Sequence, residues 1–293
     1  MKRRMITLLS VLLSALCMSV ALVACGDQVG EAVQEGEFLF TLNGDRKSYS
    51  VSAAEAGEAT GAIEIPETFK GKPVTAIGEN AFGGCDKLTA VVIPNSVTSV
   101  EWNAFANCEA LTTLTFPASV TTIGEDAFAN CTRLQSVTFG KNSKLKTIAD
   151  EAFIRCSALT DISLPSGLTS IGQRTFQECN LLSGVVMPNS VTKLGEQAFL
   201  KCFSLQSITL STGLNTIEFE TFSECGLKTI TIPAGVTKIC ERAFARCYHL
   251  ESVTFTLPNR WDIGGDTVKV NEDLSWNANY LTSAYVNSVW TRI

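Results

Sequence analysis

Hydrophobic and polar positions repeat along this chain with a period of 23 residues, from about residue 63 to residue 255. The pattern is clearest in residues 111–133, LTTLTFPASVTTIGEDAFANCTR, where large apolar residues alternate with short polar ones. One such unit cannot bury its apolar side alone. Repeats of this length therefore predict a solenoid, in which neighbouring units stack in register and share a continuous core.

One Phe and one Cys recur in eight consecutive repeats, and the Cys always follows the Phe by three residues. The steps between successive repeats are 23, 23, 25, 23, 23, 23 and 22 residues. We expect both columns to point inward and to form a structural ladder. The ladder consists of Phe82, Phe105, Phe128, Phe153, Phe176, Phe199, Phe222 and Phe244 with Cys85, Cys108, Cys131, Cys156, Cys179, Cys202, Cys225 and Cys247.

Each repeat predicts two short extended stretches and one tight turn. Leu111, Leu114 and Phe116 mark the first strand, and a Pro then ends it where a missing N–H is tolerated. Val120 and Ile123 mark the second stretch. The Ala-Phe-x-x-Cys segment that follows predicts a short helical or 3₁₀ turn. The expected fold is a solenoid of stacked, parallel, short β-strands.

A solenoid leaves an apolar end uncovered, so the array needs a cap. Residues 37–62 predict an N-terminal cap with a β-hairpin, because the apolar segments 38–42 and 49–51 flank the turn signal Asn43-Gly44. Residues 25–36 precede this cap. Most of them are polar or acidic, which predicts a flexible tether.

The N-terminus predicts export, with residues 1–24 as a signal peptide. Lys-Arg-Arg at residues 2–4 precedes the apolar run 5–23, the usual order in such signals. Leu-Val-Ala-Cys at residues 22–25 resembles a bacterial lipobox, which implies that Cys25 becomes the lipidated N-terminus of the mature protein. A plain secreted product and a retained anchor are the alternatives, since the apolar run is long enough to span a bilayer.

The repeat resembles the leucine-rich repeat of the BspA-like bacterial surface proteins, which carry Ile-Pro after the strand and Ala-Phe-x-x-Cys in the turn. The match covers most of residues 61–255, and we place the repeat array at residues 63–255. The resemblance implies a leucine-rich repeat solenoid displayed on a bacterial cell surface. It also implies binding of other macromolecules, often host proteins or other cells, and it does not imply catalysis.

The tail resembles the same proteins from Trp261 onward, so we expect residues 256–293 to form a mixed C-terminal cap. A short strand is expected near residues 268–270. A helix near residues 274–284 would place Trp276, Tyr280 and Ala284 on one face.

Charge narrows the range of partners. The formal net charge is −6, and removing residues 1–24 takes away three cationic residues and no acidic ones, which leaves −9. A surface this acidic repels phosphate backbones, so nucleic-acid binding is disfavoured. Membrane attachment is then expected only through a lipid on Cys25.

Catalytic and cofactor motifs are missing from the sequence. His249 is the single histidine, and no Gly-x-Ser-x-Gly segment offers it a nucleophile. The glycines around residues 71 and 264 lack the spacing of a phosphate-binding or dinucleotide-binding loop. We expect no enzyme activity and no cofactor.

The cysteine ladder has three possible roles. Zinc sites need closely spaced pairs, which a 23-residue period does not supply. Disulfides between adjacent repeats are an alternative in an exported protein, although each inner Cys would have two equivalent neighbours. We expect small buried thiols that donate weakly to turn carbonyls. Cys240 lies outside the ladder, where other repeats carry Gly, and is expected to be partly exposed.

The outward positions of the first strands are mainly Thr and Ser, as at Thr112, Thr113 and Thr115. Thr favours strands for its own sake, so this face is either a solvated β-surface or a broad contact surface. It carries none of the Trp, Tyr or Arg residues that dominate binding hot spots.

Departures from the repeat supply the candidate partner contacts. Trp102 and Phe219 occupy an outward position that most repeats fill with a polar residue, and each follows a Glu that replaces Gly. Either ring could instead pack over a neighbouring turn. The 25-residue repeat adds a loop with Lys141, Lys144 and Lys146, the one local basic cluster in the sequence, which is a weaker candidate or simply a solvated loop.

Together these patterns predict a lipid-anchored, surface-displayed, non-enzymatic repeat protein that mediates adhesion or protein interaction. Its expected partner is a protein of the host matrix, of another cell or of the cell envelope. The alternative is a structural scaffold or spacer in the cell envelope that self-associates.

Overall fold

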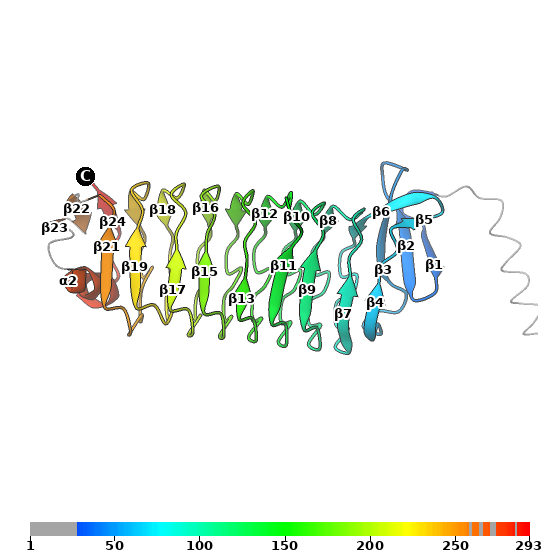
Figure 1. Ribbon diagram of the computed structural model, residues 1–293, viewed down its shortest axis with the longest axis horizontal. Helices are drawn as coiled ribbons and strands as arrows, with labels where there is room; N and C mark the ends of the chain where they lie inside the picture. The colour runs from blue at the N-terminus through cyan, green and yellow to red at the C-terminus, as the bar shows by residue number, and fades with distance from the viewer. Residues whose placement is uncertain (1–27, 258–259, 264–265, 270–273, 285) are drawn as a thin grey trace, which may run out of the picture.

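The computed structural model describes residues 28–257, 260–263, 266–269, 274–284 and 286–293. The predicted signal peptide and the predicted lipidation residue Cys25 lie outside the described residues. The molecule is a long, gently curved stack of repeats with a cap at each end (Figure 1). In the described part of the chain, no helix is long and apolar enough to cross a membrane.

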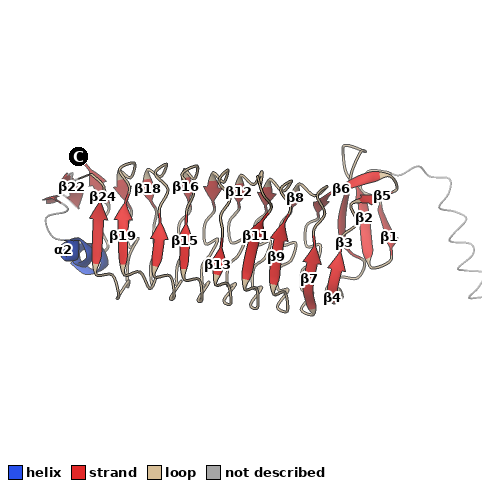
Figure 2. Cartoon of the chain, in the orientation of Figure 1, coloured by secondary structure: helices blue, strands red, loops and turns tan. Residues whose placement is uncertain are grey.

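Two rows of short parallel strands run the length of the stack (Figures 1 and 2). Leu114 pairs with Val137 in the first row, and Ile123 pairs with Ile148 in the second, so equivalent positions of neighbouring repeats stack directly. The predicted solenoid of parallel strands is confirmed. The first row comprises β4 (Gly61–Glu64), β7 (Leu88–Val92), β9 (Thr113–Phe116), β11 (Ser136–Phe139), β13 (Asp161–Ile162), β15 (Gly184–Val186), β17 (Ser207–Thr209), β19 (Thr229–Ile232) and β21 (Ser252–Phe255). The second row comprises β6 (Lys72–Ile77), β8 (Ser99–Val100), β10 (Thr122–Ile123), β12 (Thr147–Ile148), β14 (Ser170–Ile171), β16 (Lys193–Leu194), β18 (Thr216–Ile217) and β20 (Lys238–Ile239).

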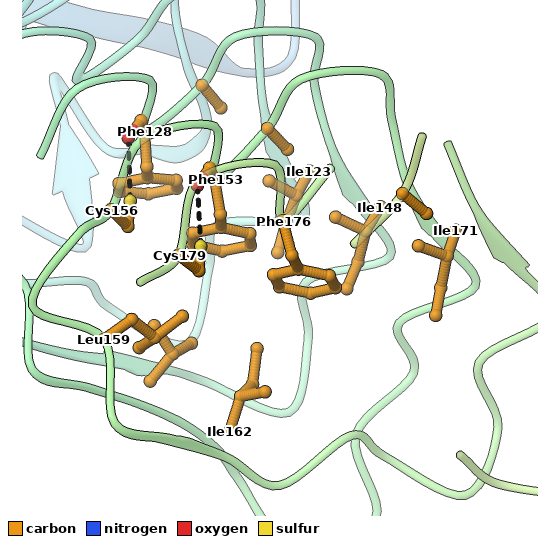
Figure 3. Close-up of a cluster of buried hydrophobic side chains, with 14 of the residues drawn as sticks. Ile123, Phe128, Ile148, Phe153, Cys156, Leu159, Ile162, Ile171, Phe176 and Cys179 are labelled. Carbon is orange, nitrogen blue, oxygen red and sulfur yellow. Dashed lines mark hydrogen bonds between the residues drawn. The ribbon is translucent and has the colours of Figure 1, made fainter. Parts of the chain in front are cut away.

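The phenylalanine column forms a continuous stack of eight buried rings, from Phe82 to Phe244. Neighbouring ring centroids are 5.1 Å apart at Phe82–Phe105 and 5.8 Å apart at Phe153–Phe176, and these planes tilt by 9° and 4°. Near-parallel rings at this separation are offset stacks, each of which adds about 0.5–1.5 kcal/mol beyond area burial. Figure 3 shows three of these rings beside the matching Ile column.

The Ala-Phe-x-x-Cys turns are tight, as predicted, but they are not helical. Ala106 N–H bonds to Asn103 O and Cys108 N–H bonds to Phe105 O, whereas the N–H groups of Phe105 and Asn107 bond to carbonyl oxygens of the next repeat. Asn103 and Asn107 have φ of 56° and 61°. A left-handed residue at two places in each turn interrupts a 3₁₀ path and sends alternate N–H groups to the neighbouring repeat.

The N-terminal cap extends the second row of strands. β2 (Phe38–Leu42) and β3 (Tyr49–Ala53) form the predicted antiparallel hairpin, and β3 pairs in parallel with β6. The predicted tether of residues 25–36 is too long, because β1 (Ala32–Glu35) lies within it and pairs with β2. β1 can pair because Glu35 and Phe38 are joined by a tight turn, and Val33 packs partly against the core. Phe69, in β5 (Thr68–Phe69), closes this end by stacking on Phe40 at 4.1 Å.

The C-terminal cap closes the other end with both strands and a helix. β24 (Trp290–Arg292) pairs antiparallel with β20 and with β22 (Arg260–Ile263), which in turn pairs with β23 (Asp266–Lys269), near the expected strand. The expected helix is present as α2 (Leu274–Asn279), continued by a π-helical turn, η1 (Tyr280–Ala284). Asn277 donates to Val253 O at 2.9 Å and fixes α2 to the last repeat. The predicted face of Trp276, Tyr280 and Ala284 lies outside the described side chains.

Candidate partner-binding surfaces

The cysteine ladder is a buried structural feature. Each thiol from Cys108 to Cys247 donates to the carbonyl oxygen of the column Phe one repeat earlier, for example Cys156 to Phe128 and Cys179 to Phe153, both at 3.3 Å (Figure 3). Burial raises the pKa of Cys247 to about 12 and that of the fully enclosed Cys131 well above its usual range. These thiols stay neutral and lack the thiolate that nucleophilic or metal-binding cysteines need. Among the described residues, no group of His, Cys, Asp and Glu is placed to hold a metal ion.

The face of the first strand row is mostly solvated hydroxyls. Neighbouring hydroxyls bond along the stack, as between Thr115 and Thr138 at 2.9 Å. Val92 and Val186 interrupt this pattern, and Val186 is 71% exposed. A shallow depression of about 380 Å³ lies beside Val186, where Gly184 supplies no side chain. This face offers area without an anchoring aromatic side chain.

Trp102 stands out from the ridge between the second strand row and the turns. Its side chain is 45% exposed, although its backbone carbonyl accepts from Asn80 N–H. The Asp126 carboxyl of the next repeat lies near the Trp102 side chain. Partial burial and the carboxylates of Glu151 and Glu125 raise the pKa of Asp126, and the nearby Trp102 side chain opposes this shift. A half-exposed Trp beside a polar group has the properties of an interface anchor.

Phe219 is placed differently from Trp102. The guanidinium carbon of Arg242 lies 5.9 Å from the centre of the Phe219 ring, and the ring is half-buried. Arg242 also pairs with Glu220 at 2.9 Å. Five repeats separate the two aromatic residues, about 24 Å at the usual strand spacing, so they do not form one site.

The lysine loop lies on another edge of the stack, between the first and second strand rows. Lys141 and Lys144 are exposed. The Lys146 ammonium donates to Gly167 O at 3.2 Å, so it is held against the next repeat. All three lysines are exposed, and they precede the second strand of their repeat, whereas Trp102 follows the second strand of its own.

Two ladders of polar side chains flank the turns, and sequence reasoning missed them. They occupy the two left-handed positions of each repeat, two residues before the Phe and two residues after it. The first ladder runs Asn80, Asn103, Asp126, Glu151, Arg174, Gln197, Glu220 and Arg242, and the second runs Gly84, Asn107, Asn130, Arg155, Glu178, Lys201, Glu224 and Arg246. The recurrence of Asn in the first repeats was the available signal, because Asn tolerates this conformation.

The second strand row is interrupted near its C-terminal third. β16 pairs with β14 and β18 pairs with β20, but within the described residues β16 and β18 do not pair. A polar groove of about 490 Å³ lies there, lined by Lys193 and by the carboxylates of Asp150, Glu196 and Glu218. Beside it, the half-buried Cys240 thiol bonds to Glu218 at 3.3 Å, and partial burial with this bond raises the pKa of Cys240 to about 11.

Large exposed side chains also gather where each turn leads into the next first strand. Leu181, Phe203 and Tyr248 stand directly after the ladder cysteines or one residue later, and all three are exposed. Phe203 and Tyr248 line a small cavity with His249. Sequence reasoning considered His249 only for a catalytic role and overlooked the two rings, although Asp86 and Glu109 show that the position of Phe203 and Tyr248 is polar in early repeats.

Comparison with known proteins identifies the repeats. The model of the BspA type leucine-rich repeat region, in six copies, matches residues 62–183 and 169–265. No curated protein sequence matches the chain.

Three solved structures are similar. A leucine-rich cell surface protein from Faecalibacterium prausnitzii is 29% identical, with a TM-score of 0.60, over 85% of this chain and 61% of the other. A leucine-rich repeat protein from Bacteroides ovatus is 30% identical, with a TM-score of 0.58, over 78% of this chain and 53% of the other. The leucine-rich repeat protein of T. pallidum is 28% identical, with a TM-score of 0.52, over 75% of this chain and 91% of the other. The chain thus spans about three fifths of the F. prausnitzii protein and half of the B. ovatus protein.

Proposed function

Because the chain belongs to the BspA-type leucine-rich repeat family, we propose that it is a bacterial cell-surface protein that binds other proteins and performs no catalysis. The F. prausnitzii protein whose structure it resembles is described as a cell surface protein. Solenoids present long surfaces of repeated side chains, and such surfaces commonly bind macromolecules. The proposed partner is a protein of the host matrix, of another cell or of the cell envelope.

The observation that carries this proposal is the half-exposed Trp102 on a polar ridge. Trp is enriched among binding hot spots, and the Asp126 carboxyl near this ring adds a polar group at its edge. Phe219 is a weaker contact in this proposal, because Arg242 already covers it. Lys141 and Lys144 add contacts to an acidic partner in this proposal. Lys146 contributes less, because its ammonium group is hydrogen-bonded to Gly167 O.

A capture assay tests the role of Trp102. The full chain, immobilised, is exposed to matrix proteins and to proteins of its own envelope, in parallel with a Trp102→Ser variant. We expect at least a tenfold loss of capture, the scale of an interface hot spot, with the melting temperature unchanged. Glu125→Ser, at the same exposed ridge position one repeat on, is the matched control. Equal loss of capture and of melting temperature would assign Trp102 to packing and remove it from the proposal.

Lipid attachment at Cys25 is the second part of the proposal, supported by the lipobox-like segment at residues 22–25. A single Cys25→Ser substitution should move the protein from the membrane fraction to the soluble fraction. Mass spectrometry of the wild-type N-terminal peptide should show an acylated Cys25. An intact N-terminus that retains residues 1–24 would instead indicate an anchor that is not cleaved.

The alternative function is a self-associating envelope scaffold. The observation in its favour is the long strand face on which Val92 and Val186 are exposed among hydroxyls. Sedimentation of the full chain distinguishes the two functions: a concentration-dependent dimer that Val186→Lys abolishes supports the scaffold, and a monomer supports the binding protein.

A further inference from the structure

A one-residue deletion in the sequence creates a slot in the edge of the solenoid. Only Gly226 lies between the ladder residue Cys225 and Leu227, where the neighbouring repeats have two residues between the Cys and the equivalent Leu. Gly226 N–H bonds to Cys202 O, and a Cβ on Gly226 would overlap the carbonyl oxygen of Phe203. This close approach makes glycine necessary, so the repeat contributes no side chain at this edge.

Aromatic side chains stand on both sides of the missing one. Phe203 belongs to the repeat before Gly226 and Tyr248 to the repeat after it, and both residues directly follow a ladder Cys. Phe203 is 55% exposed and Tyr248 is 82% exposed. Together with Gly226 and Cys225, these two residues line a cavity of about 140 Å³.

The size of the slot fits one six-membered ring. Its volume is close to that of a cavity of about 150 Å³ that accommodates a single benzene molecule. Two strand spacings separate the repeats of Phe203 and Tyr248, about 10 Å. A flat ring touching both aromatic faces needs about 7–8 Å, so a thicker, puckered ring fills this distance better.

The rim of the slot is polar but has no unpaired charge. The guanidinium of Arg246 pairs with the carboxylate of Glu224 at 3.2 Å, and His249 lies beside them. The carboxylate accepts hydrogen bonds, the guanidinium donates them, and the imidazole offers further polar nitrogen atoms. A phenyl or aliphatic group would desolvate these groups without giving them partners. Neighbouring hydroxyl groups on one ring would satisfy them.

We propose that this slot binds one pyranose ring of a glycan, held between Phe203 and Tyr248 and hydrogen-bonded to Glu224, Arg246 and His249. The apolar C–H faces of the sugar lie against the two aromatic rings, and its hydroxyls meet the polar rim. Tyr248 has few contacts of its own, so its ring is free to turn onto the ligand. The slot uses none of the residues of the Trp102 ridge, and the proposal stands without the protein-binding function proposed above.

The test is saturation-transfer difference NMR on the full chain, with methyl glycosides of glucose, galactose, mannose, N-acetylglucosamine and N-acetylgalactosamine as probes. At least one glycoside should show transfer to its ring protons. Phe203→Ala and Tyr248→Ala should each lower its affinity about tenfold, the loss of one aromatic contact. Leu181→Ala, an exposed apolar residue on the same edge but outside the slot, should leave the affinity unchanged. Both aromatic residues are exposed, so the melting temperatures of all three variants should match that of the parent.

Further probes identify the source of the sugar and show whether the glycan proposal is wrong. Oligosaccharides released from host glycoproteins and soluble fragments of bacterial wall polysaccharide are compared for binding to the same variants, and preferential binding names the source. If no saccharide binds, or if binding survives in the Phe203→Ala/Tyr248→Ala double variant, the proposal is wrong. If N-acetylphenylalanine amide occupies the slot while no glycoside does, the slot takes a peptide side chain and the glycan proposal is likewise overturned.

Discussion

The N-terminal and C-terminal halves of the array meet the same backbone requirement with different side chains. In the first repeats the left-handed positions carry mainly Asn, and the Asn side chains bond from one repeat to the next, as between Asn130 and Asn107 at 3.0 Å. In later repeats the same positions carry Arg, Glu, Gln and Lys. There, ion pairs such as Arg174–Glu151 at 3.0 Å replace the hydrogen bonds between Asn side chains.

This difference shows that the repeat imposes the backbone conformation, and the residue type changes only the free energy needed to adopt it. Asn adopts the left-handed region readily, whereas this conformation destabilises an ordinary L-residue by about 1–2 kcal/mol. The N–H groups at these positions bond to the neighbouring repeat in both halves, as with Asn107 to Ala129 and Glu178 to Leu200. Exposed ion pairs stabilise the folded state by only about 0.2–1 kcal/mol, which does not offset this destabilisation fully. The later repeats should therefore be the weaker half of the stack.

The largest effect should be equal in both halves. Phe105→Ala and Phe199→Ala each remove a fully buried ring from the same stack and should each lower the free energy of unfolding by about 3–5 kcal/mol. Urea denaturation of each variant measures this, with Phe203→Ala as an exposed control that should change the value by less than about 0.5 kcal/mol. A much smaller loss for Phe199→Ala would mean that the halves also differ in core packing.

Truncating the left-handed residues should separate the halves. Asn107→Ala places an unsuited residue at φ 61° and removes the bond to Asn130, so we expect a loss of about 1–1.5 kcal/mol. Glu178→Ala, at φ 60°, replaces one unsuited residue by another and removes two contacts, the ion pair with Arg155 and a 3.3 Å hydrogen bond from Gln177, so about 0.5 kcal/mol is expected. Chemical denaturation compares the two directly. Equal losses would show that Asn has no conformational advantage here.

Asp126 lies where the Asn ladder gives way to charged residues, and it should respond to pH. Its folded pKa is raised above 3.8 by partial burial and by Glu151 and Glu125, so the folded state binds more protons than the unfolded state just above pH 3.8. Its contribution to stability therefore falls as pH rises through the interval between these two pKa values and stays low at neutral pH. Asp126→Asn should raise stability at neutral pH by about a few tenths of a kcal/mol, because solvent screens the repulsion around this largely exposed carboxylate. The gain should vanish at a pH below 3.8, and thermal melting at several pH values measures it; an unchanged melting temperature at neutral pH would contradict this account.

Salt should give the smallest effect. Screening weakens exposed ion pairs, so moderate salt should lower the stability contributed by Arg174–Glu151 by a few tenths of a kcal/mol. The Glu151→Asn/Arg174→Asn variant should lose this dependence and keep about the parent stability. Melting curves at low and high salt test it, and an unchanged salt dependence in the variant would place the sensitivity elsewhere.

Much of the fold could be predicted from the sequence because one period encodes one repeat. The strand positions of Leu114 and Ile123, the inward Phe and Cys columns, the N-terminal hairpin and the helix of the C-terminal cap all follow from local patterns. The turn conformation at Asn103 and Asn107 could not be read in this way. It depends on N–H groups bonding to the neighbouring repeat, and its one local signal, the recurring Asn, is lost in the later repeats.

The candidate site was less predictable for the same reason. A search for departures from the repeat finds Trp102 and Phe219, but only the packing of adjacent repeats shows that Asp126 lies near one ring and Arg242 covers the other. The slot between Phe203 and Tyr248 needs three successive repeats at once. Its sequence signals are a shortened step and two aromatic residues 45 positions apart, which no single repeat displays.

The sequence by itself determined the solenoid, its register and the residues of its core, because stacking identical positions buries the same apolar side chains in every repeat. The tertiary structure alone decided the left-handed ladders, the pairing of β1, the interruption between β16 and β18 and the exposure of each surface ring. These features arise from contacts between unlike side chains of neighbouring repeats. Such contacts depend on the differences between repeats, and a periodic pattern shows only what the repeats have in common.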